Sequence, residues 1–120
     1  MRNIYKASCE GVHYVYVDTP NHNLNDAKGA SHEEAIRTLH NFLDSRVSLI
    51  ENLIDILSQG YEDFEGSCIE MLMAYEYLFD STCNDSIIKC LKDLRVQLKA
   101  AARDIETGSV EYKEVEIEFE

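Results

Sequence analysis

Residues 31–60 read SHEEAIRTLHNFLDSRVSLIENLIDILSQG, and this stretch predicts the long amphipathic helix around which the rest of the chain folds. Ser31 and Glu34 have the spacing of a capping box at the start of a helix. Gly60 is the expected end of the helix. Between these ends, apolar residues recur every three or four positions and therefore share one helical face: Ile36, Leu39, Leu43, Val47, Ile50, Ile54 and Leu57.

The length of this helix has a consequence for packing. About 28 residues at about 1.5 Å each make a helix about 42 Å long. A domain of 120 residues does not need a helix of that length to cover its core. We therefore expect other helices, or a second copy of the chain, to wrap the C-terminal half.

A hairpin is predicted ahead of the long helix. Residues 4–7 and 12–17 form its strands, and residues 9–11 form its turn. The second strand, VHYVYV, is β-branched and aromatic throughout, so at least one of its faces is expected to be covered. Residues 20–29 are polar and rich in Asn, Asp and Gly, which predicts a contact loop of unusual length.

Two further helices follow the long one. Ser67 and Glu70 form a second capping box, although the apolar stripe also extends further back, across Gly66, which favours an earlier start. A cap within residues 84–86 opens the third helix, and Gly108 ends it.

The last segment returns to a strand pattern. Residues 110–119 alternate in polarity, and the alternation shifts by one residue at Lys113 and Glu114, which predicts a bulge there. This strand is expected to pair with the hairpin, because two strands alone are only marginally stable. The element order β-β-α-α-α-β predicts a single α+β domain over residues 1–120.

Charge is strongly segregated along the chain. The formal net charge is −12, from 23 acidic and 11 basic residues. Nine acids and no Lys or Arg lie between Arg46 and Lys89. The third helix then carries five bases within one arc of about 120°: Lys89, Lys92, Arg95, Lys99 and Arg103. This basic stripe either pairs with acids of the first two helices or cradles an anionic small ligand.

The acidic segments are the predicted contact surface for a protein partner. Acids at alternate positions of a strand lie about 6.6 Å apart and can imitate a phosphate backbone. Tyrosine beside acids is a common interface composition, although tyrosines also close a core with the hydroxyl at its rim. The predicted partner-binding residues are Glu62, Asp63, Glu65, Glu70, Tyr75, Glu76, Tyr77, Asp80, Glu116 and Glu118.

The sequence contains no motif for catalysis, for a cofactor or for a metal. His32 and His40 are eight residues apart and do not form the i, i+4 pair of a zinc helix. The four cysteines include no CxxC pair, and Gly-rich phosphate loops and nucleophile elbows are absent. A non-enzymatic protein is therefore expected. No N-terminal signal pattern and no apolar stretch of membrane-spanning length is found, which predicts a cytoplasmic protein with reduced thiols.

Three functions fit this profile. The first is an inhibitor that occludes a basic surface of another protein, which is typical of anti-defence proteins of viruses or mobile elements and of immunity proteins that neutralise toxins. The second is an oligomeric module that sequesters an anionic nucleotide through Lys89, Lys92, Lys99 and Arg103. The third is a regulatory subunit that forms a homo-oligomer through the long helix. Nucleic acid and membranes are not expected partners, because a chain of net charge −12 repels polyanions.

Overall fold

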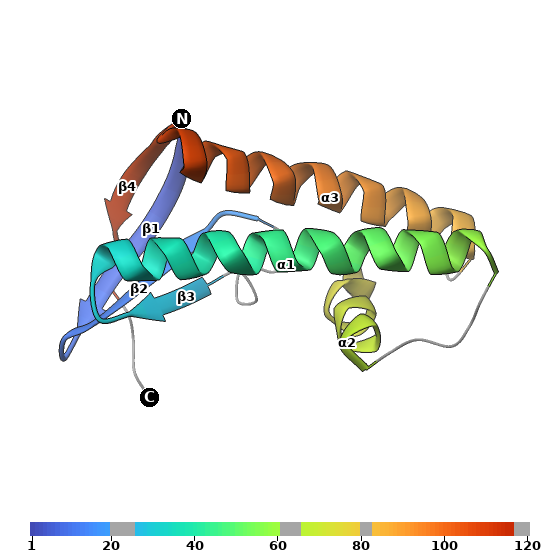
Figure 1. Ribbon diagram of the computed structural model, residues 1–120, viewed down its shortest axis with the longest axis horizontal. Coiled ribbons are helices and arrows are strands. Elements are labelled where there is room, and N and C mark those ends of the chain that lie inside the picture. Colours follow the sequence, from blue (N-terminus) through green and yellow to red (C-terminus); the bar gives the residue numbers. More distant parts are fainter. Residues whose placement is uncertain (20–25, 61–65, 80–82, 117–120) are drawn as a thin grey trace.

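Two antiparallel helices form the long axis of the molecule. The computed structural model describes residues 1–19, 26–60, 66–79 and 83–116. Helix α1 (His32–Ser58) and helix α3 (Asn84–Thr107) run side by side along most of their length (Figure 1). Helix α2 (Gly66–Tyr75) packs against the C-terminal half of α1, and the 3-10 turn η2 (Glu76–Leu78) follows it. The expectation that other helices wrap this half of α1 is confirmed.

The long helices make the molecule elongated. Its extents are 47 × 34 × 22 Å, and its radius of gyration is 15.6 Å. A compact domain of this length has a radius of gyration of about 14 Å. The difference arises because the sheet covers only one end of the pair of long helices, whereas α2 lies near the other end (Figure 1).

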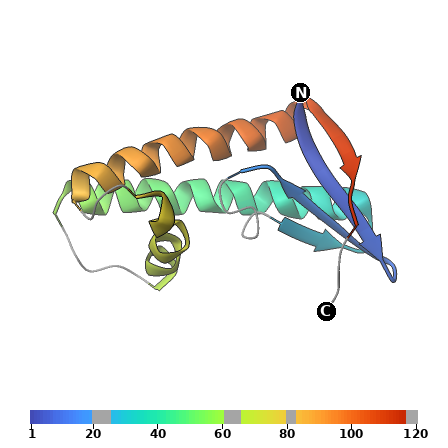
Figure 2. The same ribbon diagram turned by 180° about the vertical axis from the view of Figure 1, so that it is seen from behind.

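The sheet has four strands and mixed topology. Its strands are β1 (Arg2–Cys9), β2 (Val12–Val17), β3 (Asp26–Gly29) and β4 (Val110–Glu114), in the order β3-β2-β1-β4. β1 and β2 are antiparallel, as are β2 and β3, whereas β4 lies parallel to β1 (Figure 2). The predicted α+β class, the hairpin and the return of the last strand to the hairpin are confirmed.

Two predictions about the strands are wrong. Residues 20–29 were expected to be a loop, but the last four form β3; this edge strand reads DAKG and buries only one apolar side chain, that of Ala27, so it lacks a strand pattern. The predicted bulge is absent, because β4 pairs with β1 in continuous register from Arg2↔Val110 to Lys6↔Glu114. β4 also ends at Glu114, while residues 20–25 and 117–120 lie outside the described residues.

The helix ends follow their local signals in part. Ser31 Oγ accepts a hydrogen bond from the Glu34 N–H at 3.2 Å, and Glu34 Oε2 accepts one from the Ala30 N–H at 3.1 Å. The predicted start of α1 is therefore confirmed. Gly108 ends α3 with a left-handed φ of 73°.

The starts of the other two helices differ in outcome. Helix α2 already includes Gly66, so the earlier of its two predicted starts is confirmed, and Ser67, its second residue, is not its cap. The N-cap residue of α3 is Cys83, immediately before the predicted residues 84–86.

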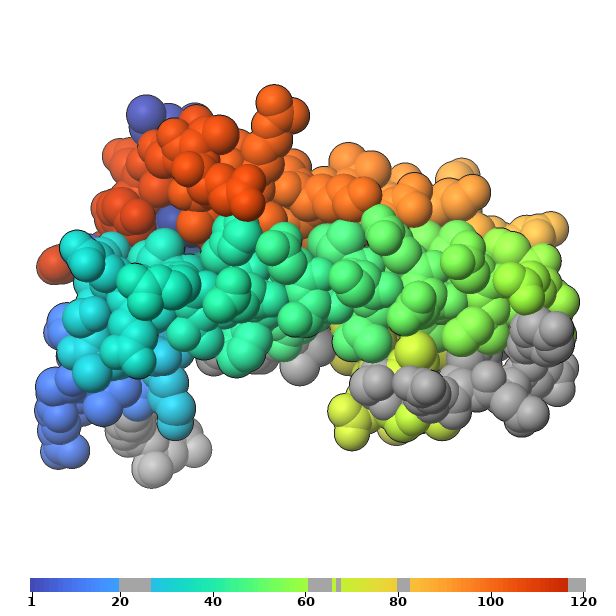
Figure 3. Space-filling view, viewed as in Figure 1, coloured from blue at the N-terminus to red at the C-terminus, as the bar shows by residue number. Residues whose placement is uncertain are grey.

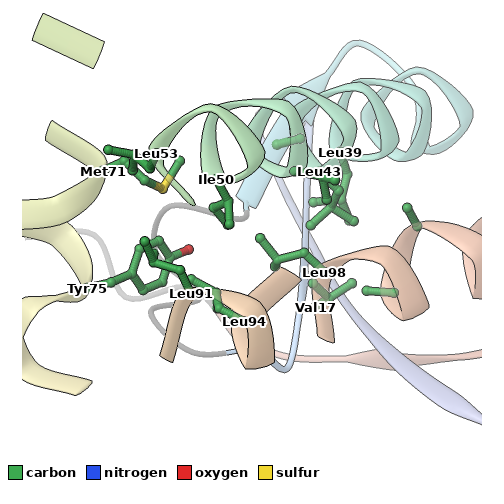
Figure 4. Close-up of a cluster of buried hydrophobic side chains, with 14 of the residues drawn as sticks. Val17, Leu39, Leu43, Ile50, Leu53, Met71, Tyr75, Leu91, Leu94 and Leu98 are labelled. Atoms are coloured by element: carbon green, nitrogen blue, oxygen red, sulfur yellow. The ribbon is translucent and has the colours of Figure 1, made fainter. Parts of the chain in front are cut away.

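One hydrophobic core runs from the sheet to α2. Val15 and Val17 of β2 and Ile4 of β1 lie on the face that packs beneath the N-terminal half of α1. Further along, side chains from all three helices meet (Figure 4); they include Ile50, Leu53, Met71, Tyr75, Leu91, Leu94 and Leu98. The core thus anchors α2 to both long helices.

Side-chain contacts tie the long helices to each other and to the sheet. Arg2 Nε of β1 donates to Asp104 Oδ2 of α3 at 2.8 Å. His40 Nε2 of α1 lies 2.9 Å from Glu106 Oε1 of α3. These contacts fix the sheet end of the molecule relative to the helices.

Candidate functional site

Helix α2 is apolar on two opposite sides. Cys68, Met71 and Tyr75 point into the core and are nearly or fully buried. Ile69 and Met73 follow at i, i+4 spacing on the other side of the helix, where their exposed fractions are 43% and 66%. A surface helix usually places charged or polar residues on the side that faces water. The second apolar side of α2 is therefore the feature that requires a functional explanation.

η2 extends this exposed side. Tyr77 lies four residues after Met73, and 62% of it is exposed. Glu70 and Glu76 are exposed on either side of the apolar residues, and the segment from Gly66 to Leu78 contains no Lys or Arg. We call Ile69, Glu70, Met73, Glu76 and Tyr77 the α2 face.

The core holds the α2 face in place. Tyr75 is fully buried and lies beside Leu91 between the helices (Figure 4). Cys90 Sγ of α3 donates a hydrogen bond to the backbone oxygen of Leu78 at 3.6 Å, which ties η2 to α3. The face is therefore presented by an anchored segment, which lowers the entropic cost of binding.

An apolar furrow adjoins the α2 face. One cavity of about 280 Å³ lies between α1 and α2, where its walls include Phe42, Leu49, Glu70 and Ala74. Phe42 also lines a second cavity of about 500 Å³ beside the β3 edge of the sheet. The two cavities share Phe42 and lie beneath α1, where the space-filling view is hollowed between the sheet and α2 (Figure 3); we call the pair the furrow. Glu70 borders both the furrow and the α2 face.

Two bases, Arg46 and Lys28, line the furrow. The Arg46 guanidinium lies 5.6 Å from the centroid of the Phe42 ring, at cation–π distance. In the cavity between α1 and α2, Arg46 thus comes from one wall and Glu70 of the α2 face from the other.

The structure brings together part of the predicted partner-binding set. Glu70, Glu76 and Tyr77 lie on the α2 face. Tyr75 does not, because its side chain is buried, and its prediction as a contact residue is wrong. Glu116 is exposed after β4, at the sheet end of the molecule, and so does not join the others (Figure 1). Five predicted acids lie outside the described residues: Glu62, Asp63, Glu65, Asp80 and Glu118.

The basic stripe of α3 is partly used within the chain. Lys99 Nζ lies 2.9 Å from Glu51 Oε1 of α1, and this hydrogen bond lowers the pKa of the Glu51 carboxyl. Lys89, Lys92 and Arg103 are exposed. Within the described part of the chain, the cavities at the sheet end and between α1 and α2 are lined by residues other than these.

Sequence reasoning missed the apolar half of the site. Ile69 and Met73 were not singled out, although together with Tyr77 they have i, i+4, i+8 spacing. The sequence did contain one indication of this apolar face, because the side of the second predicted helix that should face water carries few charged residues. The contribution of Phe42 depends on how α1 and α2 pack, and no local pattern shows it.

Metal binding and membrane insertion find no support in the part of the chain that the structure describes. Within it, no group of three or more His, Cys, Asp or Glu side chains is arranged to hold a metal ion. None of its helices combines the length and the apolarity needed to cross a membrane.

The fold and the α2 face define a small acidic α+β domain that presents one exposed apolar helix face. No protein-family model matches this chain, and neither curated proteins nor solved structures give a match.

Proposed function

We propose that this chain is a non-enzymatic binding protein that inhibits or neutralises another protein by covering a basic surface on it. The proposal places it with the anti-defence proteins of viruses and mobile elements or with the immunity proteins that neutralise toxins. The carrying observation is the second apolar side of α2, where Ile69, Met73 and Tyr77 face water between two acids.

The energetics favour docking at the α2 face. Burying one large apolar side chain fully contributes about 1.5–3 kcal/mol. Tyrosine and methionine are both enriched in the centres of protein interfaces. The flanking acids, with a net charge of −12 behind them, attract a basic partner and speed its association. Apolar residues at the centre of the face thus supply affinity, and Glu70 and Glu76 select for a basic surface.

The negative charge of the α2 face also favours a protein as the partner over nucleic acid or a membrane. Nucleic acid and anionic membranes would be repelled by an acidic docking face. A cytoplasmic location is part of the proposal, because thiols stay reduced there and Cys83 is exposed.

The test uses variants of the α2 face with a matched control. Met73→Ala and Tyr77→Ala remove exposed side chains from the face, and Val96→Ala removes one of similar exposure, 64%, from α3. Each tagged protein is purified from host cells, and the proteins that co-purify are identified and then remade for calorimetry. We expect one basic protein to bind the parent and Val96→Ala alike. Met73→Ala and Tyr77→Ala should each lose about 2 kcal/mol, or about 30-fold in affinity.

Two results would contradict the proposal. The first is equal binding of the partner to Met73→Ala, Tyr77→Ala and the parent. The second concerns the effect of salt on the association rate. We expect this rate to fall as the NaCl concentration rises. We also expect the double variant Glu70→Gln with Glu76→Gln to associate more slowly, with a smaller change in its dissociation rate. An association rate that does not change with salt would rule out the role of the acids.

A further inference from the structure

A separate cavity of about 280 Å³ lies at the sheet end of the molecule. It is lined by Lys6, Ala7, Ser8, His13, His32, Glu114 and Val115. These residues come from β1, β2, the first turn of α1 and the end of β4. The hairpin, the start of α1 and the end of β4 thus meet around one small space at the sheet end of the molecule, away from α2 (Figure 1).

Strand register directs polar side chains into this cavity. Lys6 pairs with Val15, and Ser8 pairs with His13, so Lys6 and His13 lie on the same side of the sheet as the buried Val15. Along most of the sheet this side is apolar and covered by α1. At this end of the sheet the same side carries Lys6, Ser8 and His13. Apolar residues would be expected here if this side of the sheet only packed against α1.

Tyr112 of β4 lies beside two of these groups. The His32 ring meets the Tyr112 ring edge-on, with centroids 4.7 Å apart. The Lys6 ammonium lies 5.8 Å from the same ring centroid. The same tyrosine ring therefore lies beside both side chains.

The cavity brings one lysine and two histidines together in an acidic protein. Partial burial, and then the nearby Lys6 ammonium and His13, lower the pKa of His32, while Glu33 opposes them. The acid closest to Lys6 is held loosely, because Glu114 Oε1 lies 4.0 Å from Nζ and 87% of its side chain is exposed. An incoming anion can therefore displace Glu114 from Lys6 at little cost.

We propose that this cavity binds a small oxyanion of the phosphate class, such as the phosphate group of a small metabolite. Lys6, His13 and His32 supply the donors, and the start of α1 adds the positive end of the helix dipole. Ligand cavities begin at about 300 Å³, so the space suits a small ligand rather than a dinucleotide. The site is independent of the α2 face, and either proposal can fail alone.

The proposed anion site lies in this cavity and not on the basic stripe of α3, where the sequence had suggested one. Lys6 lines a cavity, whereas Lys92 lies exposed on a helix surface. Lys6→Met and Lys92→Met each remove one positive charge and therefore form a matched pair. They separate binding in the cavity from binding to the stripe.

The experiment follows the histidine ring signals by NMR while sulfate or inorganic phosphate replaces chloride at constant ionic strength. We expect saturable shifts at His13 and His32, and none of similar size at His40, whose ring contacts Glu106 and Asp44. Lys6→Met should weaken binding at least about tenfold. Lys92→Met should leave it unchanged, and Glu114→Gln should strengthen it.

Sulfate binding should also depend on pH. Sulfate keeps its charge across the neutral range, so any change in its affinity reports on the protein. The charged and titratable groups around the site are Lys6 from β1, His13 from β2, His32 and Glu33 from α1, and Tyr112 and Glu114 from β4. A bound anion favours protonated histidine and so raises the pKa of His32. Affinity should therefore rise as the pH falls from about 7.5 to about 5.5.

Four results would overturn the proposal. These are the absence of saturable shifts, equal shifts at His40 (an adventitious ion only), a larger loss of binding in Lys92→Met than in Lys6→Met, and a sulfate affinity that does not change with pH. If Lys6→Met does not fold, Glu114→Gln still tests the proposal. It changes an exposed side chain and is expected to bind the anion more tightly.

Discussion

Gly29 shows how one residue limits the distance between the sheet and α1. A side chain at this position would place its Cβ 2.8 Å from the Ala35 backbone nitrogen and 3.0 Å from Glu34 Cβ. Atoms of real side chains do not approach a backbone that closely. Glycine therefore lets β3 lie directly against the first turn of α1, and the anion cavity is built around that same turn.

Gly29→Ala should accordingly destabilise the protein by about 1–3 kcal/mol, because β3 and α1 must move apart. Gly66→Ala is the control, since a Cβ there meets no atom within 4 Å. Alanine suits a helix better than glycine, so Gly66→Ala should be neutral or stabilising by up to about 1 kcal/mol. Urea unfolding of both variants checks this, and equal effects would show that the close approach at Gly29 does not matter.

Individual elements differ in how far their sequence predicts them. α1 and α3 were predictable because apolar spacing and end signals such as Ser31 and Gly108 are local. β3 was not predictable, because DAKG joins the sheet only through pairing with β2. The parallel direction of β4 likewise depends on the route of the whole chain.

Only those residues of the candidate site that the pattern of charged and tyrosine residues pointed to could be predicted from the sequence. Glu70, Glu76 and Tyr77 were found from composition, whereas Tyr75 was assigned to the surface although its spacing from Met71 places it on the buried side of α2. His13 and His32 were not recognised as neighbours. Only the tertiary fold brings the start of β2 to the start of α1.

The N-cap of α1 can be tested as an element. Ser31→Ala removes the acceptor for the Glu34 N–H and should lower the free energy of unfolding by about 1 kcal/mol. Ser45→Ala lies on the exposed surface of the same helix and should change it by no more than about 0.5 kcal/mol. Thermal or urea unfolding distinguishes the two. A loss in Ser45→Ala as large as that in Ser31→Ala would contradict the role of the cap.

Charge acts on the whole molecule. The screening length is about 30 Å at 0.01 M salt and about 8 Å at 0.15 M. The molecule measures 47 × 34 × 22 Å, so at low salt most of its acids repel one another. This repulsion opposes folding in a chain of net charge −12. Partner binding through a basic surface would relieve part of it.

The melting temperature should therefore rise by a few degrees when NaCl increases from about 0.01 to about 0.15 M. Differential scanning calorimetry measures the change. Neutralising the exposed acids Asp55 and Glu111, as Asp55→Asn with Glu111→Gln, should make the rise smaller. A melting temperature that falls with added salt would mean that attractive ion pairs, such as Lys99 with Glu51, outweigh the repulsion.

The two edge strands of the sheet, β3 and β4, have features that discourage aggregation. β3 has only four residues, and β4 carries exposed Glu111 and Glu114. Short strands and charged side chains both discourage pairing with another chain.

The parallel pairing of β4 with β1 determines the order in which the sheet can be completed. Arg2 pairs with Val110, so β1 receives β4 as its neighbour only after more than a hundred further residues have been made. Until then β1 can pair with β2 alone, and its other edge offers unpaired backbone groups. Closing so long a loop is slow. The newly made protein therefore passes through a stage in which a chaperone, or a strand of a neighbouring nascent chain, can occupy the place of β4.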